Sequence, residues 1–499
     1  MEFSTHNMDA IPEATISKAG LLAHLQSFLP SEAVLHEDED LRPYECDGLS
    51  AYRRVPMMVV LPGTVEHVQR IVKLCKEYNV PVVARGAGTG LSGGALPLEN
   101  GVLLSLAKFK SILDIDPVAR TARVQPGVRN LAISDAARPF GLYYAPDPSS
   151  QIACTIGGNV AENSGGVHCL KYGLTVHNIL ELKMIAIDGE LITFGSGALD
   201  SPGYDMLAVM TGSEGMLGII VEVTVRLLPV PERAQVVLAA FDDVAKAGAA
   251  VGAIIAAGVV PAGLEMMDKL AIQAAEDFVH AGYPRDAQAI LLCELDGSNE
   301  EVSEQIMRVR EILNQGGATD VRTAKNEHER ALFWQGRKAA FPAVGRISPD
   351  YYCMDGTIPR KRLPEVLRRI DELSREYNLP VANVFHAGDG NLHPLILYDA
   401  NIPGELARTE AFGGKILQLC VDVGGTITGE HGVGMEKINQ MCSQFNRAEL
   451  EQFHALKHAF DEKGLLNPGK AVPTLHRCAE FGAMHVHKGE LAFPELERF

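Results

Sequence analysis

Glycine crowds one stretch of this chain, Arg-Gly-Ala-Gly-Thr-Gly-Leu-Ser-Gly-Gly at residues 85–94, between two short apolar runs. The runs at residues 80–84 and 102–106 are both typical of strands. Three of the glycines match the G-x-G-x-x-G pattern of dinucleotide-binding folds, but that pattern needs a helix directly after the glycines. Here a proline and a Glu-Asn-Gly turn lead into another strand. The chain therefore does not fit a Rossmann domain, although its backbone N–H groups could still cradle a phosphate as a nest.

Two further glycine-rich stretches, at residues 146–166 and 211–220, resemble this first loop. Glycine is needed where the backbone turns tightly or where another group comes close to it. Tight turns alone are one interpretation of the three loops. Three such loops within one domain favour the other interpretation, in which the backbone closely approaches a bound ligand.

The chain has 499 residues, 46% of them hydrophobic, and a formal net charge of −18. This length gives room for two or three domains with sizeable cores. The negative charge argues against nucleic acid and against an anionic membrane as main partners. The N-terminus lacks the basic and apolar regions of a signal peptide. Residues 247–263 are apolar, but the run is short for a membrane span and fits a buried helix followed by a strand.

Nine cysteines are scattered along the chain without a C-x-x-C pair or a repeated spacing. An odd number of cysteines without a pattern predicts reduced thiols in a cytoplasmic protein. The same scatter leaves the chain without a recognisable iron–sulfur site.

Apolar runs in the first half of the chain alternate with glycine and proline, and one clear helix is expected at residues 64–78. After residue 231 the pattern changes to three strand–helix–strand units, at residues 235–266, 287–323 and 350–397. Helices placed between strands in this way are typical of a split β-α-β layer. The predicted fold class is therefore α+β.

Two histidines and a carboxylate form the most informative chemical pattern in the chain. His386 and His393 lie in Val-Phe-His-Ala-Gly-Asp-Gly-Asn-Leu-His-Pro, and Glu430 and His431 lie further on in Gly-Glu-His-Gly-Val-Gly. A spacing of seven on a glycine-rich segment does not fit one helix face and predicts a strand, a turn and a returning strand. Two imidazoles and a carboxylate are ligands that a divalent cation takes in a catalytic site. His431 offers a base within reach of whatever the cation holds.

Together these motifs resemble the FAD-linked 2-hydroxy-acid dehydrogenases of the vanillyl-alcohol-oxidase/PCMH flavoprotein superfamily, and most of all the glycolate oxidase group. The similarity spans about residues 40–472. Its most specific parts are residues 85–94, 146–166, 212–220, 386–394, 429–434 and 467–470.

The resemblance implies an α+β fold made of a PCMH-type FAD-binding domain and an α/β cap domain built on an antiparallel sheet. The expected division is a helical lead-in at residues 1–40, the FAD-binding domain at 41–231, the cap with the metal site at 232–459, a return segment at 460–475 and a C-terminal tail at 476–499.

In this family the first glycine loop wraps the FAD pyrophosphate, and the other two loops line the adenosine and the isoalloxazine. The first loop has no His or Cys that could tether the flavin, so the resemblance implies non-covalent FAD. His168 and Cys169 are interpreted as ordinary loop residues. The residues expected to bind FAD are Arg85, Gly86, Ala87, Gly88, Thr89, Gly90, Ser92, Pro146, Asp147, Ser150, Thr155, Gly157, Gly158, Asn159, Asn163, Gly165, Glu214, Gly215, Ile220 and Asn467.

The resemblance also assigns roles to the histidine motifs. His386, His393 and Glu430 match the ligands of a divalent metal, with Zn, Mn or Fe as the ion, and His431 matches the proton acceptor. Arg337, in Trp-Gln-Gly-Arg, matches the arginine that binds the substrate carboxylate, a task that suits a guanidinium fork. The implied reaction is a metal-assisted hydride transfer from a 2-hydroxy acid to FAD, which gives the 2-oxo acid.

Two departures from the family pattern bear on the substrate. Relatives that act on D-2-hydroxyglutarate carry a lysine where this chain has Cys353 and an asparagine where it has Leu395. Without those polar groups a short monocarboxylate fits better. We therefore expect oxidation of glycolate to glyoxylate, and the alternative is a D-lactate dehydrogenase that acts without partner subunits.

Reoxidation of FAD requires an electron acceptor, and the sequence has no iron–sulfur motif, haem-attachment motif or membrane segment. The resemblance implies an iron–sulfur subunit and a second flavoprotein-like subunit as partners. It also implies a cytoplasmic location, with membrane association only through those partners. The tail at residues 476–499, with Phe481, Phe493 and Phe499, is either a packed arm or a docking strip for the iron–sulfur subunit.

The residues alone also allow two other classes of protein. A metal hydrolase built on the His/His/Glu pattern would leave the glycine loops of the first half unexplained. A scaffold subunit without catalysis would have no use for an arginine, a base and a metal site in one chain.

Overall fold

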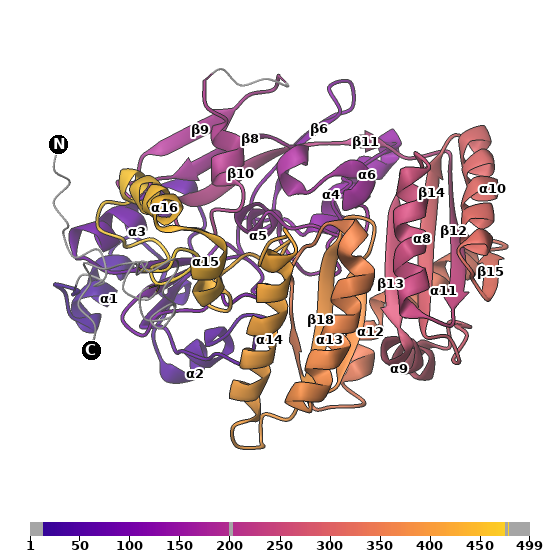
Figure 1. Ribbon diagram of the computed structural model, residues 1–499. Helices are drawn as coiled ribbons and strands as arrows, with labels where there is room; N and C mark the ends of the chain where they lie inside the picture. The colour runs from indigo at the N-terminus through magenta and orange to yellow at the C-terminus, as the bar shows by residue number, and fades with distance from the viewer. Residues whose placement is uncertain (1–12, 199–202, 475–477, 479–499) are drawn as a thin grey trace. The chain divides into compact units, whose positions relative to one another are not determined.

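The computed structural model describes residues 13–198, 203–474 and 478, which belong to two compact units (Figure 1). The first unit comprises Met1–Ser164, Leu174–Pro229 and His431–Phe499, and the second comprises Gly165–Gly173 and Val230–Glu430. The return to the first unit therefore comes at His431, earlier than the expected position at residue 460. The short segment Gly165–Gly173, expected within the FAD-binding domain, belongs to the second unit.

The first unit contains a four-stranded sheet of order β1-β2-β4-β3, an antiparallel five-stranded sheet of order β5-β6-β10-β8-β9, and the pair β11-β7. Strands β2, β4 and β3 run parallel, and β1 is antiparallel to β2. The strands are β1 (Val34–Leu35), β2 (Met58–Val60), β3 (Val82–Arg85), β4 (Val102–Ser105), β5 (Ile112–Asp116), β6 (Thr121–Val124), β7 (Leu142–Tyr143), β8 (Ile179–Ile185), β9 (Leu191–Gly195), β10 (Ile219–Arg226) and β11 (Leu228–Pro229). The helices are α1 (Lys18–Gln26), α2 (Asp38–Leu41), α3 (Val65–Glu77), α4 (Asn130–Ala137), α5 (Ile156–Glu162), α7 (Met206–Met210), α15 (Ile438–Gln444) and α16 (Arg447–Phe460).

Helix α3 shows how the sequence builds this unit. Its N-cap is Thr64, whose side chain accepts a hydrogen bond from His67 N at 3.2 Å, as the sequence predicted. The apolar stripe of the helix, which includes Val68, Ile71 and Val72, is fully buried against the four-stranded sheet. The helix therefore sets one layer of the core that holds β3 and the glycine loop after it.

The C-terminal part of the first unit is bound to strands from early in the chain. Leu466 forms a parallel bridge with Val82 of β3. Val82 N donates to Leu465 O at 2.8 Å, and Asn467 N donates to Val82 O at 2.8 Å. Leu465 and Leu466 are buried in the same core as α3. This first unit is therefore built from segments far apart in the sequence.

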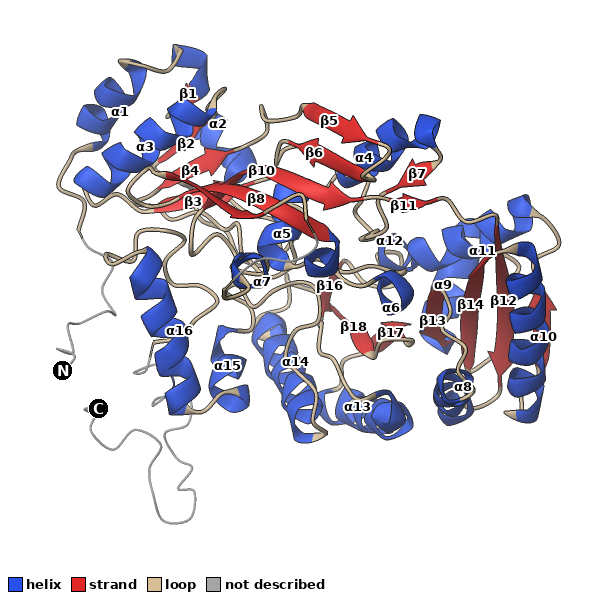
Figure 2. Cartoon of the chain, turned by 90° about the horizontal axis from the view of Figure 1, so that it is seen from above, coloured by secondary structure: helices blue, strands red, loops and turns tan. Residues whose placement is uncertain are grey.

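The second unit is built on one antiparallel seven-stranded sheet of order β15-β12-β14-β13-β17-β18-β16. Helices α8, α10, α13 and α14 cover one face of the sheet, and α9, α11 and α12 cover the other (Figure 2). The strands are β12 (Arg233–Phe241), β13 (Gly263–Asp268), β14 (Ala289–Gly297), β15 (Asp320–Thr323), β16 (Asp350–Cys353), β17 (Val381–His386) and β18 (Asn391–Tyr398). The helices are α6 (Cys169–Tyr172), α8 (Val244–Ala256), α9 (Lys269–Val279), α10 (Asn299–Gln315), α11 (Glu327–Lys338), α12 (Ala340–Val344), α13 (Leu363–Tyr377) and α14 (Glu405–Asp422).

The three strand–helix–strand units predicted for this region are confirmed as β12-α8-β13, β14-α10-β15 and β16-α13-β17. The α+β fold class is confirmed as well. Helices α9, α11 and α12 were not predicted. They form the layer that packs on the face of the sheet opposite to the predicted helices.

The next two findings concern the cysteines and the membrane-spanning potential of the helices. The prediction that all cysteines are reduced is wrong, because Cys442 of α15 is joined to Cys478 in a disulfide. Both lie in a small apolar cluster with Leu450. The fold places the two cysteines side by side, and no spacing pattern in the sequence marks them as a pair. Among the described residues, no helix has the length and apolarity to cross a membrane. Apart from Cys478, the predicted docking tail at residues 476–499 lies outside the described residues.

Candidate active site and flavin-binding loops

The predicted strand, turn and returning strand of the histidine motif are confirmed as the hairpin β17-β18. Val384 pairs with His393, and His386 pairs with Asn391. Side chains two residues apart on a strand share a face, and directly paired residues also share a face. Both imidazoles therefore lie on one side of the sheet, with ring centroids 5.0 Å apart.

Glu430 completes this cluster within the second unit. Its Oε1 lies 2.9 Å from His393 Nε2 and 3.3 Å from His386 Nε2. Possible ligand atoms of the three residues all lie within 4.8 Å of one another. The structure thus brings together the three side chains that the sequence predicted as metal ligands.

A buried carboxylate, Asp355, orients the loop that carries Glu430. It accepts hydrogen bonds from Gly429 N at 3.1 Å, from Glu430 N at 3.2 Å and from the Thr428 hydroxyl at 2.5 Å. Asn391 Nδ2, at the start of β18, donates to the same carboxylate at 2.9 Å. Asp355 therefore ties the Glu430 loop to the histidine hairpin, a role that the sequence analysis did not assign to it.

The second nitrogen of each imidazole also has a partner. His386 Nδ1 donates to Glu265 Oε1 at 2.8 Å, and His393 Nδ1 donates to the carbonyl of Met354 at 3.2 Å. These bonds leave both Nε2 atoms directed at Glu430. Carboxylate and carbonyl partners of this kind fix the ring orientation of metal-binding histidines. The donor set and its supporting bonds therefore fit a divalent cation.

Glu265 of β13 is a site residue that the sequence analysis missed. Met266 pairs with Phe385, which places Glu265 across from His386. Its other oxygen, Oε2, lies 2.6 Å from Arg337 NH2, and both side chains are only 1% exposed. A lone acid in the apolar strand Gly-Leu-Glu-Met-Met was the signal that could have found it. Arg337 is thus held next to the cluster by an ion pair.

Opposite charges stabilise one another within the cluster. Burial would raise the pKa of Glu430, but His386 and His393 hold it well below its usual range. Burial would lower the pKa of His393, but Cys353 and Glu430 raise it to about 10. Burial acts in the same way on His386, and Glu265 and Glu430 raise its pKa well above the usual range. An anionic carboxylate between two cationic rings is a charge pattern that a divalent cation with neutral imidazoles would reproduce.

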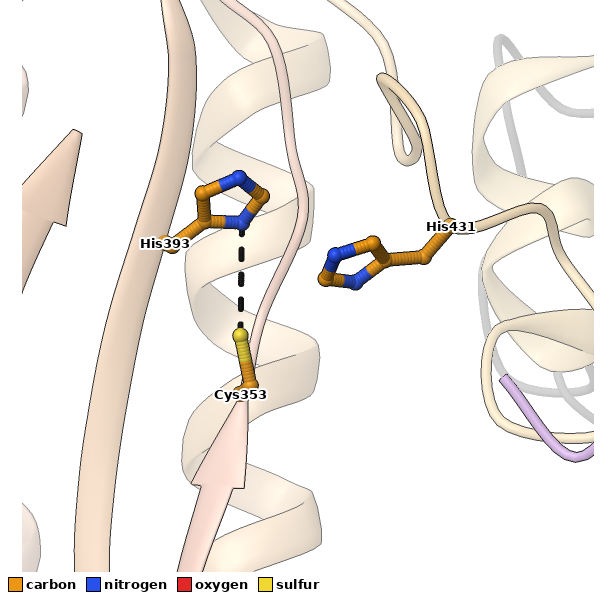
Figure 3. A group of neighbouring side chains, drawn as sticks. All are labelled: Cys353, His393 and His431. Carbon is orange, nitrogen blue, oxygen red and sulfur yellow. Dashed lines mark hydrogen bonds between the residues drawn. The ribbon is translucent and has the colours of Figure 1, made fainter. Parts of the chain in front are cut away.

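Besides Glu430 and His386, His393 has apolar or weakly polar neighbours. Cys353 Sγ lies 4.0 Å from His393 Nδ1. Figure 3 marks this contact with a dashed line. Cys353 pairs with Leu395 across β16 and β18, and both are buried in the core of the second unit. The Phe341 ring lies 6.4 Å from the His393 ring. Cys353, Phe341 and Leu395 form what we call the apolar wall of the site.

The first glycine loop runs from β3 to β4 without a helix, which confirms that it is not a Rossmann turn. The second stretch is different from the prediction, because residues Ile156–Glu162 form helix α5 instead of a loop. Gly157, Gly158 and Asn159 therefore lie in a helix. A Cβ at Gly157 would lie 2.5 Å from Pro126 Cβ, so close packing explains this glycine. A Cβ at Gly86 would lie 2.3 Å from Thr155 Oγ1, which places the first loop against the second stretch.

Comparisons with known proteins agree with this geometry. Residues 56–195 match the model of an FAD binding domain, and residues 230–471 match that of FAD linked oxidases, C-terminal domain. The glycolate oxidase subunit GlcD of Escherichia coli (strain K12) is 68% identical over 490 residues, 98% of each chain. The D-lactate dehydrogenase of Archaeoglobus fulgidus is 34% identical over 84% of this chain and 92% of its own. The chain belongs to the FAD-linked oxidases.

The fold of this FAD-linked oxidase is that of the vanillyl-alcohol-oxidase/PCMH superfamily. A crystal structure of p-cresol methylhydroxylase with substrate bound has a TM-score of 0.78 and 18% identity, and the match covers 91% of this chain and 97% of that chain. At this identity the likeness concerns the fold alone. The family matches show that the chain is an FAD-linked oxidoreductase, and the shared fold is that of a PCMH-type FAD-binding domain.

Several predicted FAD-binding residues have buried polar atoms that fit a polar ligand. Ser92 Oγ, Thr155 Oγ1 and Asn159 Nδ2 make no hydrogen bond within the described part of the chain. A buried polar group without a hydrogen-bond partner is unfavourable in a folded protein. These three residues come from the first loop and from the start of α5. They would hold FAD.

The side chains of other predicted FAD-binding residues make hydrogen bonds to groups of the chain itself. Arg85 NH1 donates to Cys46 O at 2.6 Å, and Asn163 Oδ1 accepts from Val176 N at 2.9 Å. The side chains of Glu214 and Asn467 also bond within the first unit. The rest are placed as follows: Ala87, Gly88, Thr89 and Gly90 in the first loop; Pro146, Asp147 and Ser150 before α5; Gly215 before β10; Ile220 in β10; and Gly165 in the second unit.

The segment Gly165–Gly173 is held to the second unit by ion pairs. His168 Nε2 lies 3.2 Å from Glu294 Oε1, and Lys171 Nζ donates to Asp296 Oδ1 at 2.5 Å. These bonds hold the segment with the second unit, although the sequence analysis placed it in the FAD-binding domain.

Proposed function

We propose that this protein oxidises glycolate, or a similarly short 2-hydroxy acid, to the 2-oxo acid. The observation that carries the proposal is the convergence of His386, His393 and Glu430, supported by Glu265, in a chain with an FAD-binding domain. The similarity to the glycolate oxidase subunit GlcD supports the choice of substrate. A metal hydrolase would not use the flavin loops, and a scaffold would not use the cluster.

His386, His393 and Glu430 would hold a divalent cation, with Zn, Mn and Fe as candidates, which would supply Lewis-acid polarisation of the substrate hydroxyl. His431 follows Glu430 in the chain, and we assign to it the role of proton acceptor for that hydroxyl. Arg337 offers the donors that Glu265 does not use to the substrate carboxylate. Its Nε makes no hydrogen bond within the described residues, which supports this role.

Non-covalent FAD, when bound, would supply the two-electron acceptor that the oxidation needs. The first glycine loop contains neither His nor Cys as an attachment point. His168 and Cys169, which follow the second glycine-rich stretch, belong to the second unit, where His168 pairs with Glu294. The composition of the first loop supports a flavin without a covalent link.

The apolar wall favours a substrate with one carboxylate. Cys353 and Leu395 offer no cationic or amide group to a second carboxylate at the position next to His393. A buried carboxylate without a partner is strongly unfavourable. D-lactate differs from glycolate by one methyl group, which an apolar wall could accept, so oxidation of D-lactate is the second candidate. The similarity to the D-lactate dehydrogenase of Archaeoglobus fulgidus favours that candidate.

Anaerobic bleaching of the flavin tests the proposal. The purified protein is mixed with glycolate, D-lactate or D-2-hydroxyglutarate, and the rate of flavin reduction is measured for each. We expect rapid reduction by glycolate and slow reduction by D-2-hydroxyglutarate. Faster reduction by D-lactate would select the second candidate. The absence of reduction by all three would overturn the function.

We further propose that the protein acts as one subunit of a cytoplasmic complex that contacts the membrane only through partners. Reduced FAD needs an acceptor, and the sequence contains no iron–sulfur or haem-attachment motif. An iron–sulfur subunit and a second flavoprotein-like subunit would complete the electron path. Co-purification from a host that expresses all three chains tests this, with deletion of residues 476–499 as the variant. Loss of the iron–sulfur chain with intact flavin reduction would identify the tail as the docking strip, whereas retention would place the docking surface elsewhere.

A further inference from the structure

A buried lysine connects the end of the chain to the first flavin loop. Lys470 is 1% exposed, and its Nζ donates to Gly94 O at 3.0 Å, to Leu96 O and to Asn467 Oδ1 at 2.6 Å. An ammonium group has three donors, so all of them are used. Two of the three acceptors are backbone carbonyls at the C-terminal end of the first flavin loop.

Asn467 extends the connection to the third flavin loop. Its Nδ2 donates to Gly94 O at 2.9 Å and to Glu214 O at 2.7 Å. Its backbone adopts a positive φ of 45°. Both amide donors and the amide oxygen are thus bonded to protein groups. Asn467 shapes two flavin loops through their carbonyls.

Glu214 extends the connection to the loop that carries His431. Its carboxylate accepts hydrogen bonds from Val433 N and from Gly434 N, each at 2.7 Å. The same residue is bonded to Asn467 through its carbonyl. Gly434 in turn packs on the first flavin loop, because a Cβ there would lie 2.1 Å from Ser92 O. The loop after His431, the first flavin loop (residues 85–94) and the third flavin loop (residues 211–220) therefore meet at one buried set of polar groups.

Burying these charged groups lowers the folding free energy gained by the first unit. Burial lowers the pKa of Lys470 to about 7, although Asp47, Glu214 and Glu162 act to raise it. Burial raises the pKa of Glu214 in spite of its two backbone donors. Apolar side chains of similar size would often stabilise a protein at least as well as buried charges. Stability alone is therefore a weak reason for these residues, and the position of the loops is a stronger one.

We propose that Glu214, Asn467 and Lys470 form a positioning clasp. The clasp holds the first and third flavin loops in the shape that binds FAD, and it holds the loop after His431 in the position that proton transfer needs. The three residues act through these loops. The part that concerns His431 rests on the proposed function, whereas the part that concerns the flavin loops rests only on FAD binding.

The first test replaces Lys470 by methionine in the full chain and measures the dissociation constant of FAD. Loss of charge-assisted hydrogen bonds to the loop should weaken FAD binding by about tenfold or more. The matched control is Lys457→Met. Lys457 is also buried and also makes three bonds, to Met216 O at 2.7 Å, Leu466 O at 2.8 Å and Asp461 Oδ2 at 2.6 Å. The bond to Met216 reaches the third flavin loop, but none of the three bonds reaches the first flavin loop, so the comparison isolates the bonds to the first loop.

We expect Lys457→Met to lower the unfolding temperature but to leave FAD affinity within about threefold of the parent. Equal loss of FAD affinity in both lysine variants would overturn the clasp, because the bonds of Lys470 to the first flavin loop would then add nothing to FAD binding. Wild-type FAD affinity in Lys470→Met would overturn it as well. If Lys470→Met does not fold, Asn467→Ala carries the same expectation through the carbonyls of Gly94 and Glu214.

The second test replaces Glu214 by glutamine, which keeps the shape but offers an NH₂ group to one of two backbone donors. The rate of flavin reduction at saturating FAD and saturating substrate should fall about tenfold or more with little change in KM. An unchanged rate would overturn the His431 part of the clasp. If the parent protein oxidises no 2-hydroxy acid, the proposed function fails, and the FAD-affinity test still decides the flavin-loop part.

Discussion

Replacing Glu265 by glutamine should weaken metal binding although it replaces none of the proposed metal ligands. The Glu265 carboxylate accepts a hydrogen bond from His386 Nδ1 at 2.8 Å and forms an ion pair with Arg337 NH2 at 2.6 Å. A carboxylate behind a metal-binding histidine contributes about 10–100-fold to metal affinity or activity. This corresponds to about 1.4–2.7 kcal/mol. The variant also leaves Arg337 buried without its counter-charge, which costs about 3–5 kcal/mol of folding free energy.

The matched control for this variant is Glu294→Gln in the neighbouring strand. Glu294 is also buried and also pairs with a histidine and an arginine, His168 at 3.2 Å and Arg330 at 2.8 Å. It pairs in register with Gly263, so it lies outside the cluster. Both variants should lose stability in urea, but only Glu265→Gln should lose affinity for Zn²⁺ or Mn²⁺ in calorimetric titrations of chelator-treated protein. Wild-type metal affinity in Glu265→Gln, or equal loss in both variants, would refute the reasoning.

Four further predictions follow from the same structure. Acid denaturation should release the yellow flavin into the supernatant, and colour that stays with the precipitate would show a covalent link. His431→Ala should chiefly lower kcat. Arg337→Ala should lower kcat/KM by about 100-fold, because charge-assisted hydrogen bonds are worth about 1.5–3 kcal/mol. Near-parent flavin reduction in either variant would contradict the role of that residue. Burial would raise the pKa of Glu294, but its hydrogen-bonded partners lower it from 4.5 to about 2, so its stabilisation is complete above pH 4.5 and lost as the pH falls towards 2. The stability gap between the parent and Glu294→Gln should therefore shrink over that range, and a constant gap would argue against this shift. Alkylation of unfolded protein without reductant should leave Cys442 and Cys478 unlabelled, and reductant should add both labels.

Much of the fold follows from local patterns in the sequence. The threonine cap and apolar stripe of α3, and the long amphipathic helices α10 and α13, mark their own positions because each signal is local. The hairpin β17-β18 was predictable because a glycine-rich turn separates two apolar runs. Helix α5 was missed because glycines normally argue against a helix, and here close packing against Pro126 outweighs that preference.

The candidate site was predictable where a motif is continuous in the sequence. His386 and His393 share one hairpin, so their meeting is a local event. Glu265 joins them only through the register of β13 with β17, which no local pattern reveals. The clasp has the same character, because Lys470 bonds to Gly94 of the first flavin loop, 376 residues earlier in the chain. Long-range pairing of buried polar groups is the part that this sequence alone does not show.

The role of the cation in flavin reduction tests the account most directly. FAD-loaded protein is treated with a chelator, its metal content is verified, and anaerobic flavin reduction by glycolate is followed with and without added Zn²⁺ or Mn²⁺. Glu430→Gln is measured in parallel. The account predicts that removal of the metal slows reduction by about 100-fold or more without loss of FAD, that an added cation restores the parent and that it does not restore Glu430→Gln. Full-rate reduction in protein verified to be free of metal would contradict it.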